Sequence, residues 1–191
     1  MSNSVKKVLI AFGSRYGSSE EIATELAKIL TEKNIETNVI NLRNVKSNDW
    51  PSLNDYSGII VGSGIKASKW TKEAKNFLEI NKEELQNKIL GLFVSCADAA
   101  VPENIDKARN DYLVTIIEET GLTPQIYDAF GGVMDFTNTS KMNFLEKKIL
   151  MLVAKKRAGE GEGLLKGNFK NDFRDWDQIK SFGEKFVQNL S

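Results

Sequence analysis

Residues Val8–Phe12, Val-Leu-Ile-Ala-Phe, run directly into Gly13–Ser19, Gly-Ser-Arg-Tyr-Gly-Ser-Ser. A short apolar run of this kind is typical of a strand that is buried on both faces. The polar, glycine-bearing segment after it predicts a turn. A helix is predicted next, over about Ser19–Lys33, because the apolar residues there fall on one stripe. This strand–turn–helix unit indicates an alternating α/β chain.

The same alternation continues along the chain. Further strands are predicted at Ile35–Leu42, Gly58–Gly62, Ile89–Ser95 and Gln125–Val133, and further helices at about Lys69–Ile80, Glu103–Thr120 and Asp175–Asn189. Strands that alternate with helices form a parallel sheet with helices on both faces. The sequence therefore predicts an α/β fold, a doubly wound five-stranded parallel sheet in a single domain over residues 1–191. An insertion at about 134–173 interrupts the alternation and holds an extra predicted helix over Lys141–Arg157.

The composition excludes several kinds of chemistry. Lys plus Arg is 26 and Asp plus Glu is 26, so no overall charge attracts nucleic acid, and no nucleic-acid partner is expected. The chain has no histidine and one cysteine, Cys96. This excludes His-ligated metals, Ser–His nucleophiles and metal sites built from several cysteines. Its apolar runs are too short for a signal peptide or a membrane span, which predicts a cytoplasmic protein.

The turn after the first strand has the composition of a phosphate-binding loop. Ligands of open parallel sheets bind beyond the carboxyl ends of the strands. The hydroxyls of Ser14, Ser18 and Ser19 are potential donors to phosphate oxygens, and Gly17 allows a positive φ. The glycine fingerprint of dinucleotide sites and the Gly-Lys-Ser/Thr ending of ATP-type loops are both absent. A terminal monophosphate is therefore favoured, and the alternative is a simple helix-capping turn.

The segment Ser14–Ser19, which we call the phosphate loop, resembles the FMN phosphate loop of flavodoxins, usually Thr/Ser-x-Thr-Gly-x-Thr. The resemblance implies the flavodoxin-like strand order 2-1-3-4-5 and non-covalent FMN. The implied phosphate-loop residues are Ser14, Arg15, Tyr16, Gly17, Ser18 and Ser19. The chain is also similar to the menaquinone-dependent protoporphyrinogen IX dehydrogenases. Their third strand ends in Gly-Ala-Ser-Ile-Arg, beside Gly62–Lys66 here, and their insertion ends in Asp-Trp, as at Asp175–Trp176.

The resemblance further implies that a flavin ring lies across the loops after the third and fourth strands. We call residues Ser63–Trp70 the first ring loop and Ser95–Ala100 the second ring loop. The implied ring-site residues are Ser63, Gly64, Ile65, Lys66, Trp70, Ser95, Cys96, Ala97 and Asp98. Ile65, Trp70 and Tyr16 are candidates to cover the ring, and core packing is the alternative for Trp70. Cys96 is interpreted as a space-filling residue.

Two features bear on activity. Lys66 and Lys69 place positive charge in the first ring loop, and such charge near the ring stabilises an anionic reduced flavin; the alternative is that both point to water. The insertion helix over 141–157 is basic and apolar, which predicts peripheral contact with the inner face of the membrane or a hydrophobic substrate site, with packing on the domain as the alternative.

The expected function is an FMN oxidoreductase linked to a quinone, without a catalytic acid, base or metal. The alternatives are an electron carrier that serves a redox partner protein, and a domain that keeps the fold without flavin. Residues 135–140, Asp-Phe-Thr-Asn-Thr-Ser, differ from the Arg- and Tyr-rich insertion of the related dehydrogenases, so the substrate stays open.

Overall fold

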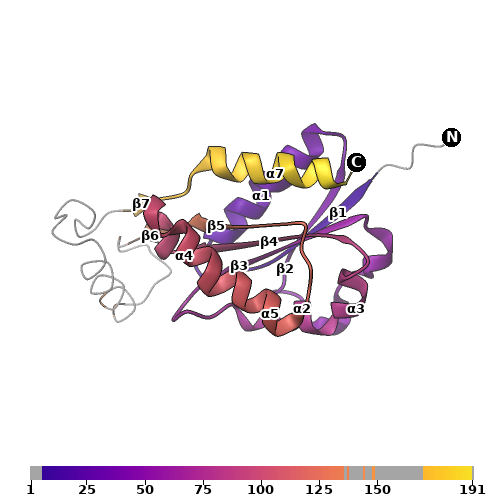
Figure 1. Ribbon diagram of the computed structural model, residues 1–191, viewed down its shortest axis with the longest axis horizontal. Helices are drawn as coiled ribbons and strands as arrows, with labels where there is room; N and C mark the ends of the chain where they lie inside the picture. Colours follow the sequence, from indigo (N-terminus) through magenta and orange to yellow (C-terminus); the bar gives the residue numbers. More distant parts are fainter. Residues whose placement is uncertain (1–5, 136, 138–143, 145–147, 149–169, 191) are drawn as a thin grey trace.

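The structure is a computed structural model that describes residues 6–135, 137, 144, 148 and 170–190 (Figure 1). A five-stranded sheet runs through it in the order β2-β1-β3-β4-β5, and each neighbouring pair is parallel. The strands are β1 (Lys7–Gly13), β2 (Glu36–Asn41), β3 (Gly58–Gly64), β4 (Ile89–Cys96), β5 (Ile126–Gly131), β6 (Val133–Asp135) and β7 (Lys170–Asp172). The helices are α1 (Ser18–Glu32), α2 (Lys72–Ile80), α3 (Lys82–Leu85), α4 (Ile105–Ala108), α5 (Thr115–Thr120) and α7 (Trp176–Asn189). The predicted fold class and strand order are confirmed.

Alternate residues of the central strands pack on opposite faces of the sheet, as a strand period of two requires. On one face, Ile10 packs in a cluster with Leu26 of α1 and Phe186 of α7. On the other face, Val61 packs in a cluster with Phe77 of α2. Figure 1 shows α1 and α7 on one side of the sheet and α2, α3, α4 and α5 on the other. Burial on both faces accounts for the uninterrupted apolar runs in β1, β3 and β4.

Two helix starts show local capping. Asp175 precedes α7, and its carboxylate accepts hydrogen bonds from the main-chain N–H groups of Asp177 and Gln178. This confirms the predicted opening of the last helix. Thr71 caps α2 by accepting a hydrogen bond from the N–H of Ala74. A threonine hydroxyl there satisfies one of the free donors at the helix start, so α2 begins at Lys72 and not at Lys69.

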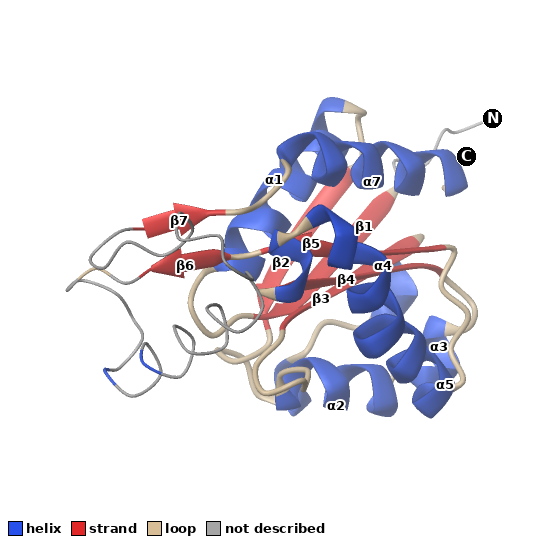
Figure 2. Cartoon of the chain, turned by 60° about the vertical axis from the view of Figure 1, so that its left-hand side comes forward, coloured by secondary structure: helices blue, strands red, loops and turns tan. Residues whose placement is uncertain are grey.

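Two predicted elements differ from the structure. The predicted continuous helix over 103–120 is divided into α4, a π-helical segment at Arg109–Val114, and α5. The predicted fifth strand extends to Val133, whereas β5 ends at Gly131 and Val133 begins β6. β6 pairs antiparallel with β7, a strand that the sequence did not predict, and the two project beyond the main sheet (Figure 2). Apart from Val133, both short strands lie within the range 134–173 that the sequence predicts to be an insertion.

Candidate functional site at the carboxyl ends of the strands

The phosphate loop and both ring loops lie side by side. In the sheet register, Gly13 at the end of β1 is paired with Ser63, and Gly64 at the end of β3 is paired with Ser95. The residues that follow these strands therefore begin at one edge of the sheet. This edge is where open parallel sheets bind their ligands.

Hydrogen bonds shape the phosphate loop around its glycine. Gly17 has φ 107°, a left-handed conformation that glycine adopts without a steric penalty. Its N–H donates to the Ser14 hydroxyl oxygen at 3.0 Å. Its carbonyl accepts from the N–H groups of Glu20 and Glu21 and so begins α1. The N–H groups of Ser18 and Ser19, at the first two helical positions, point out of the helix start, as in known anion sites.

Ser19 carries a buried hydroxyl that is available to a ligand. The residue is 1% exposed, and its Oγ has no hydrogen-bond partner among the described residues. The Oγ faces the first ring loop, 3.4 Å from where a Cβ on Gly64 would lie. A buried polar atom without a partner costs free energy, and such atoms are rare in folded proteins. A phosphate oxygen in the loop would give this hydroxyl an acceptor.

Ser18 connects the phosphate loop to the segment after β5. Its Oγ accepts a hydrogen bond from the main-chain N–H of Val133 at 3.0 Å. The hydroxyl proton is still available to a phosphate, because a serine hydroxyl both accepts and donates. No sequence pattern indicates this contact, because 115 residues separate the two partners.

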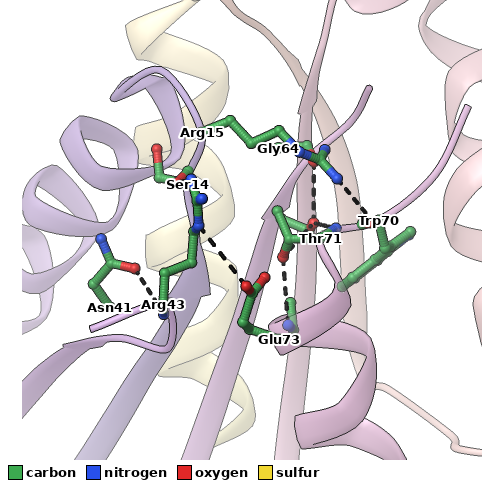
Figure 3. Close-up of polar contacts among 10 residues, drawn as sticks. Ser14, Arg15, Asn41, Arg43, Gly64, Trp70, Thr71 and Glu73 are labelled. Carbon is green, nitrogen blue, oxygen red and sulfur yellow. Dashed lines mark hydrogen bonds and ion pairs between the residues drawn. The ribbon is translucent and has the colours of Figure 1, made fainter. Parts of the chain in front are cut away.

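Arg15 crosses from the phosphate loop to the first ring loop (Figure 3). Its guanidinium donates to the carbonyl oxygens of Gly64 at 3.0 Å and Trp70 at 3.4 Å. Burial lowers the pKa of Arg15, and the nearby charge of Arg43 lowers it further. Arg43 itself donates to the Ser14 carbonyl at 3.0 Å. Arg43 was not predicted as a site residue, because it follows β2, whose loop the flavin resemblance does not include.

The first ring loop contains a tight two-residue turn. Lys66 and Lys69 exchange main-chain hydrogen bonds of 3.1 Å on either side of it. The turn residues, Ala67 and Ser68, have φ 49° and 59°. Positive φ at both central positions is the pattern of a type I′ turn, which glycine, asparagine and aspartate usually occupy. Alanine and serine there make the turn strained.

The ring loop also contacts its neighbours on both sides. Ile65, which is half-buried, donates its N–H to the carbonyl of Ser95 in the second ring loop at 3.0 Å. Lys66 Nζ lies 5.7 Å from the ring centre of Tyr16 in the phosphate loop, within cation–π range. Lys66 and Lys69 are both exposed. The loop thus joins the phosphate loop on one side and the second ring loop on the other.

Two predicted ring-site residues have structural roles. Ser63 is fully buried, and its Oγ accepts a hydrogen bond of 2.8 Å from the N–H of Thr71 before α2. Trp70 is 8% exposed, packs in the core, and donates its indole N–H to the Tyr112 carbonyl at 2.8 Å. Of the two alternatives for Trp70, the structure shows core packing. Ile65 and Tyr16 then stay as the candidates to cover a ring.

The second ring loop begins with the last two residues of β4, Ser95 and Cys96. Ser95 donates its hydroxyl to the Gly131 carbonyl at 3.3 Å, and the Cys96 side chain is buried in the core. Ala97 and Asp98 are partly buried. Asp98 accepts a hydrogen bond from the Tyr112 hydroxyl. Tyr112 was not predicted as a site residue, because it lies in a predicted helix and not in a loop that follows a strand.

The prediction for the insertion helix at 141–157 lies mostly outside the described residues. Of that range the structure describes Phe144 and Lys148, and both are exposed, Phe144 at 81%. No helix within the described ranges is long and apolar enough to cross a membrane. In the same part of the chain, no three His, Cys, Asp or Glu side chains are grouped to hold a metal ion.

The family model for the flavodoxin domain matches residues 9–162. The chain belongs to the flavodoxin domain family. A curated relative, protoporphyrinogen IX dehydrogenase [quinone] of Escherichia coli (strain K12), is 21% identical over 181 residues, which are 95% of this chain and 94% of the relative.

Solved structures show the same fold. Oxidised Flavodoxin 1 from Bacillus cereus is 18% identical with a TM-score of 0.55, and the match covers 97% of this chain and all of that one. Rubredoxin oxygen:oxidoreductase from the anaerobe Desulfovibrio gigas is 16% identical with a TM-score of 0.58. That match covers 96% of this chain but only 36% of the larger protein.

Proposed function

We propose that the protein binds FMN at the carboxyl ends of β1, β3 and β4 and transfers electrons between the flavin and a quinone. The observation that carries the proposal is the buried hydroxyl of Ser19, which has no hydrogen-bond partner in the described part of the chain and lies beside the N–H groups at the start of α1. FMN is the flavin that fits this loop, because its single terminal phosphate needs many donors and no room for a pyrophosphate. Bound FMN supplies the electron-transfer chemistry.

The protein's side chains have the role of holding and orienting the cofactor. Ser14, Ser18 and Ser19 donate to the phosphate. Arg15 holds the first ring loop against the phosphate loop through its two carbonyl contacts. Exposed Lys66 and Lys69 place positive charge at the edge of the ring site, and such charge favours reduced flavin.

Support for a quinone as electron acceptor comes from the curated relative. The name of that relative specifies a quinone, and the match extends over nearly the full length of both chains. Contact of residues 141–157 with a membrane surface belongs to the same proposal, because quinones with isoprenoid tails dissolve in the bilayer. Co-sedimentation with anionic liposomes tests that contact.

The cofactor is tested by titrating purified protein with FMN, FAD and riboflavin. We expect one FMN per chain and much weaker binding of the other two flavins. Ser18→Asp adds a charge beside the phosphate and keeps an acceptor for the Val133 N–H, so it should abolish FMN binding. The matched control, Ser18→Asn, keeps size and acceptor without the charge and should retain most of the affinity. Equal affinities for riboflavin and FMN would contradict the proposal.

A second candidate is an electron carrier that serves a protein partner. The exposed lysines at the tip of the first ring loop favour it, because a basic rim beside the flavin would attract an acidic redox protein. Steady-state reduction of a soluble menaquinone analogue separates the two candidates. Protein that binds FMN, exchanges electrons with a reductant and leaves the quinone oxidised would support the carrier.

A further inference from the structure

Tyr112 contacts both ring loops. It lies in the π-helical segment Arg109–Val114 and is 5% exposed. Its carbonyl oxygen accepts the Trp70 indole N–H at 2.8 Å. Its hydroxyl donates to the Asp98 carboxylate and is also hydrogen-bonded to the Ser68 side chain. One residue outside both loops therefore contacts two positions in the first ring loop and one in the second.

The π-helical turn is the local reason for these contacts. A π-helical turn holds more residues than an α-helical turn, which changes the direction of the side chains that follow, and such turns occur frequently at functional sites. Tyr112 lies within this turn, and its side chain belongs to the core cluster that also holds Trp70. A carbonyl has two lone pairs, so the Tyr112 carbonyl accepts the indole N–H without giving up its place in the helix.

Ser68, which the Tyr112 hydroxyl contacts, is one of the two central residues of the strained turn in the first ring loop. Ser68 has φ 59° and follows Ala67 at 49°, a pair of left-handed residues that lack glycine's freedom. Such conformations persist only where the surrounding structure holds them. The Tyr112 hydroxyl holds the turn at Ser68, and its carbonyl holds the end of the loop at Trp70.

We propose that Tyr112 is a positioning residue that fixes the separation of the two ring loops and, through it, the place of the Asp98 carboxylate relative to the flavin ring. The inference rests on the proposed FMN site. Burial raises the pKa of Tyr112, so its hydroxyl stays a neutral donor over the physiological pH range. A carboxylate held in this way adds a fixed negative charge beside the ring and opposes the positive charge of the lysines.

The test uses Tyr112→Phe, which removes only the hydroxyl and keeps the ring and the carbonyl contact to Trp70. We expect the FMN dissociation constant to rise about tenfold, the usual effect of losing one hydrogen bond to a charged group. At saturating FMN, the midpoint potential should shift, because Asp98 loses its fixed place. The matched control is Tyr127→Phe, at a tyrosine on β5 that is 40% exposed and distant from both loops in the chain, and it should change neither quantity.

A double-variant comparison separates positioning from stability. Asp98→Asn removes the charge that Tyr112 would position, so Tyr112→Phe should no longer shift the potential when it is made in the Asp98→Asn protein. Ser68→Gly should partly rescue FMN affinity in Tyr112→Phe, because glycine adopts the turn without strain.

A lower melting temperature for Tyr112→Phe, with unchanged potential and affinity, would assign it a structural role alone and overturn the inference. If Tyr112→Phe shifts the midpoint potential equally in the parent and in the Asp98→Asn protein, the inference would be overturned as well. Parent protein that binds no FMN would instead overturn the proposed function, and the inference with it.

Discussion

Ser19→Ala is the substitution that most clearly distinguishes an effect on phosphate binding from an effect on the stability of the fold. In the cofactor-free protein the Ser19 hydroxyl is buried without a partner among the described residues. Its removal takes away an unsatisfied polar atom and leaves a small side chain that fits the same space. In the FMN complex the same hydroxyl is expected to donate to the phosphate. The substitution should therefore affect stability and binding in opposite directions.

The magnitudes follow from the two environments of the hydroxyl. An unsatisfied buried polar group costs about 1–3 kcal/mol, so Ser19→Ala should raise the free energy of unfolding of the cofactor-free protein by about 1 kcal/mol. For a chain of this size, that change corresponds to a melting temperature higher by about 2–4 °C. A hydrogen bond to a charged group contributes about 1.5–3 kcal/mol, so FMN affinity should fall roughly 10- to 150-fold.

The assay combines thermal unfolding of the cofactor-free protein with flavin fluorescence titrations. Riboflavin, which lacks the phosphate, should bind parent and Ser19→Ala equally, so the FMN-to-riboflavin ratio of affinities isolates the phosphate contact. Ser18→Ala is the matched control for stability, because Ser18 has a partner in Val133 and its loss should lower the melting temperature. A destabilised Ser19→Ala protein with an unchanged FMN-to-riboflavin ratio would refute the reasoning.

Three further predictions address the loops and the strand pair. Arg15→Met should weaken the binding of FMN and of riboflavin about equally, roughly tenfold, because the Arg15 guanidinium contacts ring-loop carbonyls and not the phosphate. An affinity change confined to FMN in the same titrations would contradict this. Replacing Lys66 and Lys69 with glutamate should lower the one-electron midpoint potential by at least roughly 40 mV, since a single unit charge at roughly 8 Å and an effective dielectric near 40 contributes about 1 kcal/mol and the double substitution changes the charge by more than one unit. An unchanged potential would show that neither lysine acts on the ring. The hydrogen bond from Arg174 lowers the pKa of Asp172, so this pair stabilises the fold above pH 3.8 and its contribution is lost as the pH falls further. Urea unfolding measured from pH 7 to pH 3 should therefore show a smaller decrease in the free energy of unfolding for Asp172→Asn than for the parent protein.

The alternation of buried strands and helices could be predicted because it depends on local sequence, whereas the strand order came from the resemblance of the phosphate loop to that of flavodoxins. Strands buried on both faces require uninterrupted apolar runs, and Val8–Phe12 and Ile89–Ser95 have them. The loop after the first strand is short, so Gly17 and its neighbouring serines fix its geometry within a few residues. Asp175 and its acceptor bonds at the start of α7 are equally local. These features need only the chain neighbours to form.

The contacts that the sequence could not predict join residues far apart in the chain. Arg15 reaches carbonyl groups 49 and 55 residues away, and a main-chain acceptor leaves no signature in the side-chain sequence. Trp70 was open between ring cover and core because an aromatic residue after a strand suits both. The burial of Trp70 and its hydrogen bond to the Tyr112 carbonyl, which lies in a π-helical turn, decide between them.

The same distant contacts explain how a chain without histidine, and with its one cysteine buried, is suited to redox chemistry. The reaction of a bound flavin requires a fixed ring, a fixed phosphate and a controlled charge around both, and none of these needs a titrating side chain. Arg15 holds the phosphate loop to the first ring loop, Tyr112 holds the two ring loops together, and Ser18 holds the phosphate loop to the segment after β5. Since each of these contacts joins two different loops, a change at any of them alters the shape of the whole site. Substitutions at these residues, which do not touch the flavin, should therefore change FMN affinity and midpoint potential, whereas substitutions in the core should change only the stability of the fold.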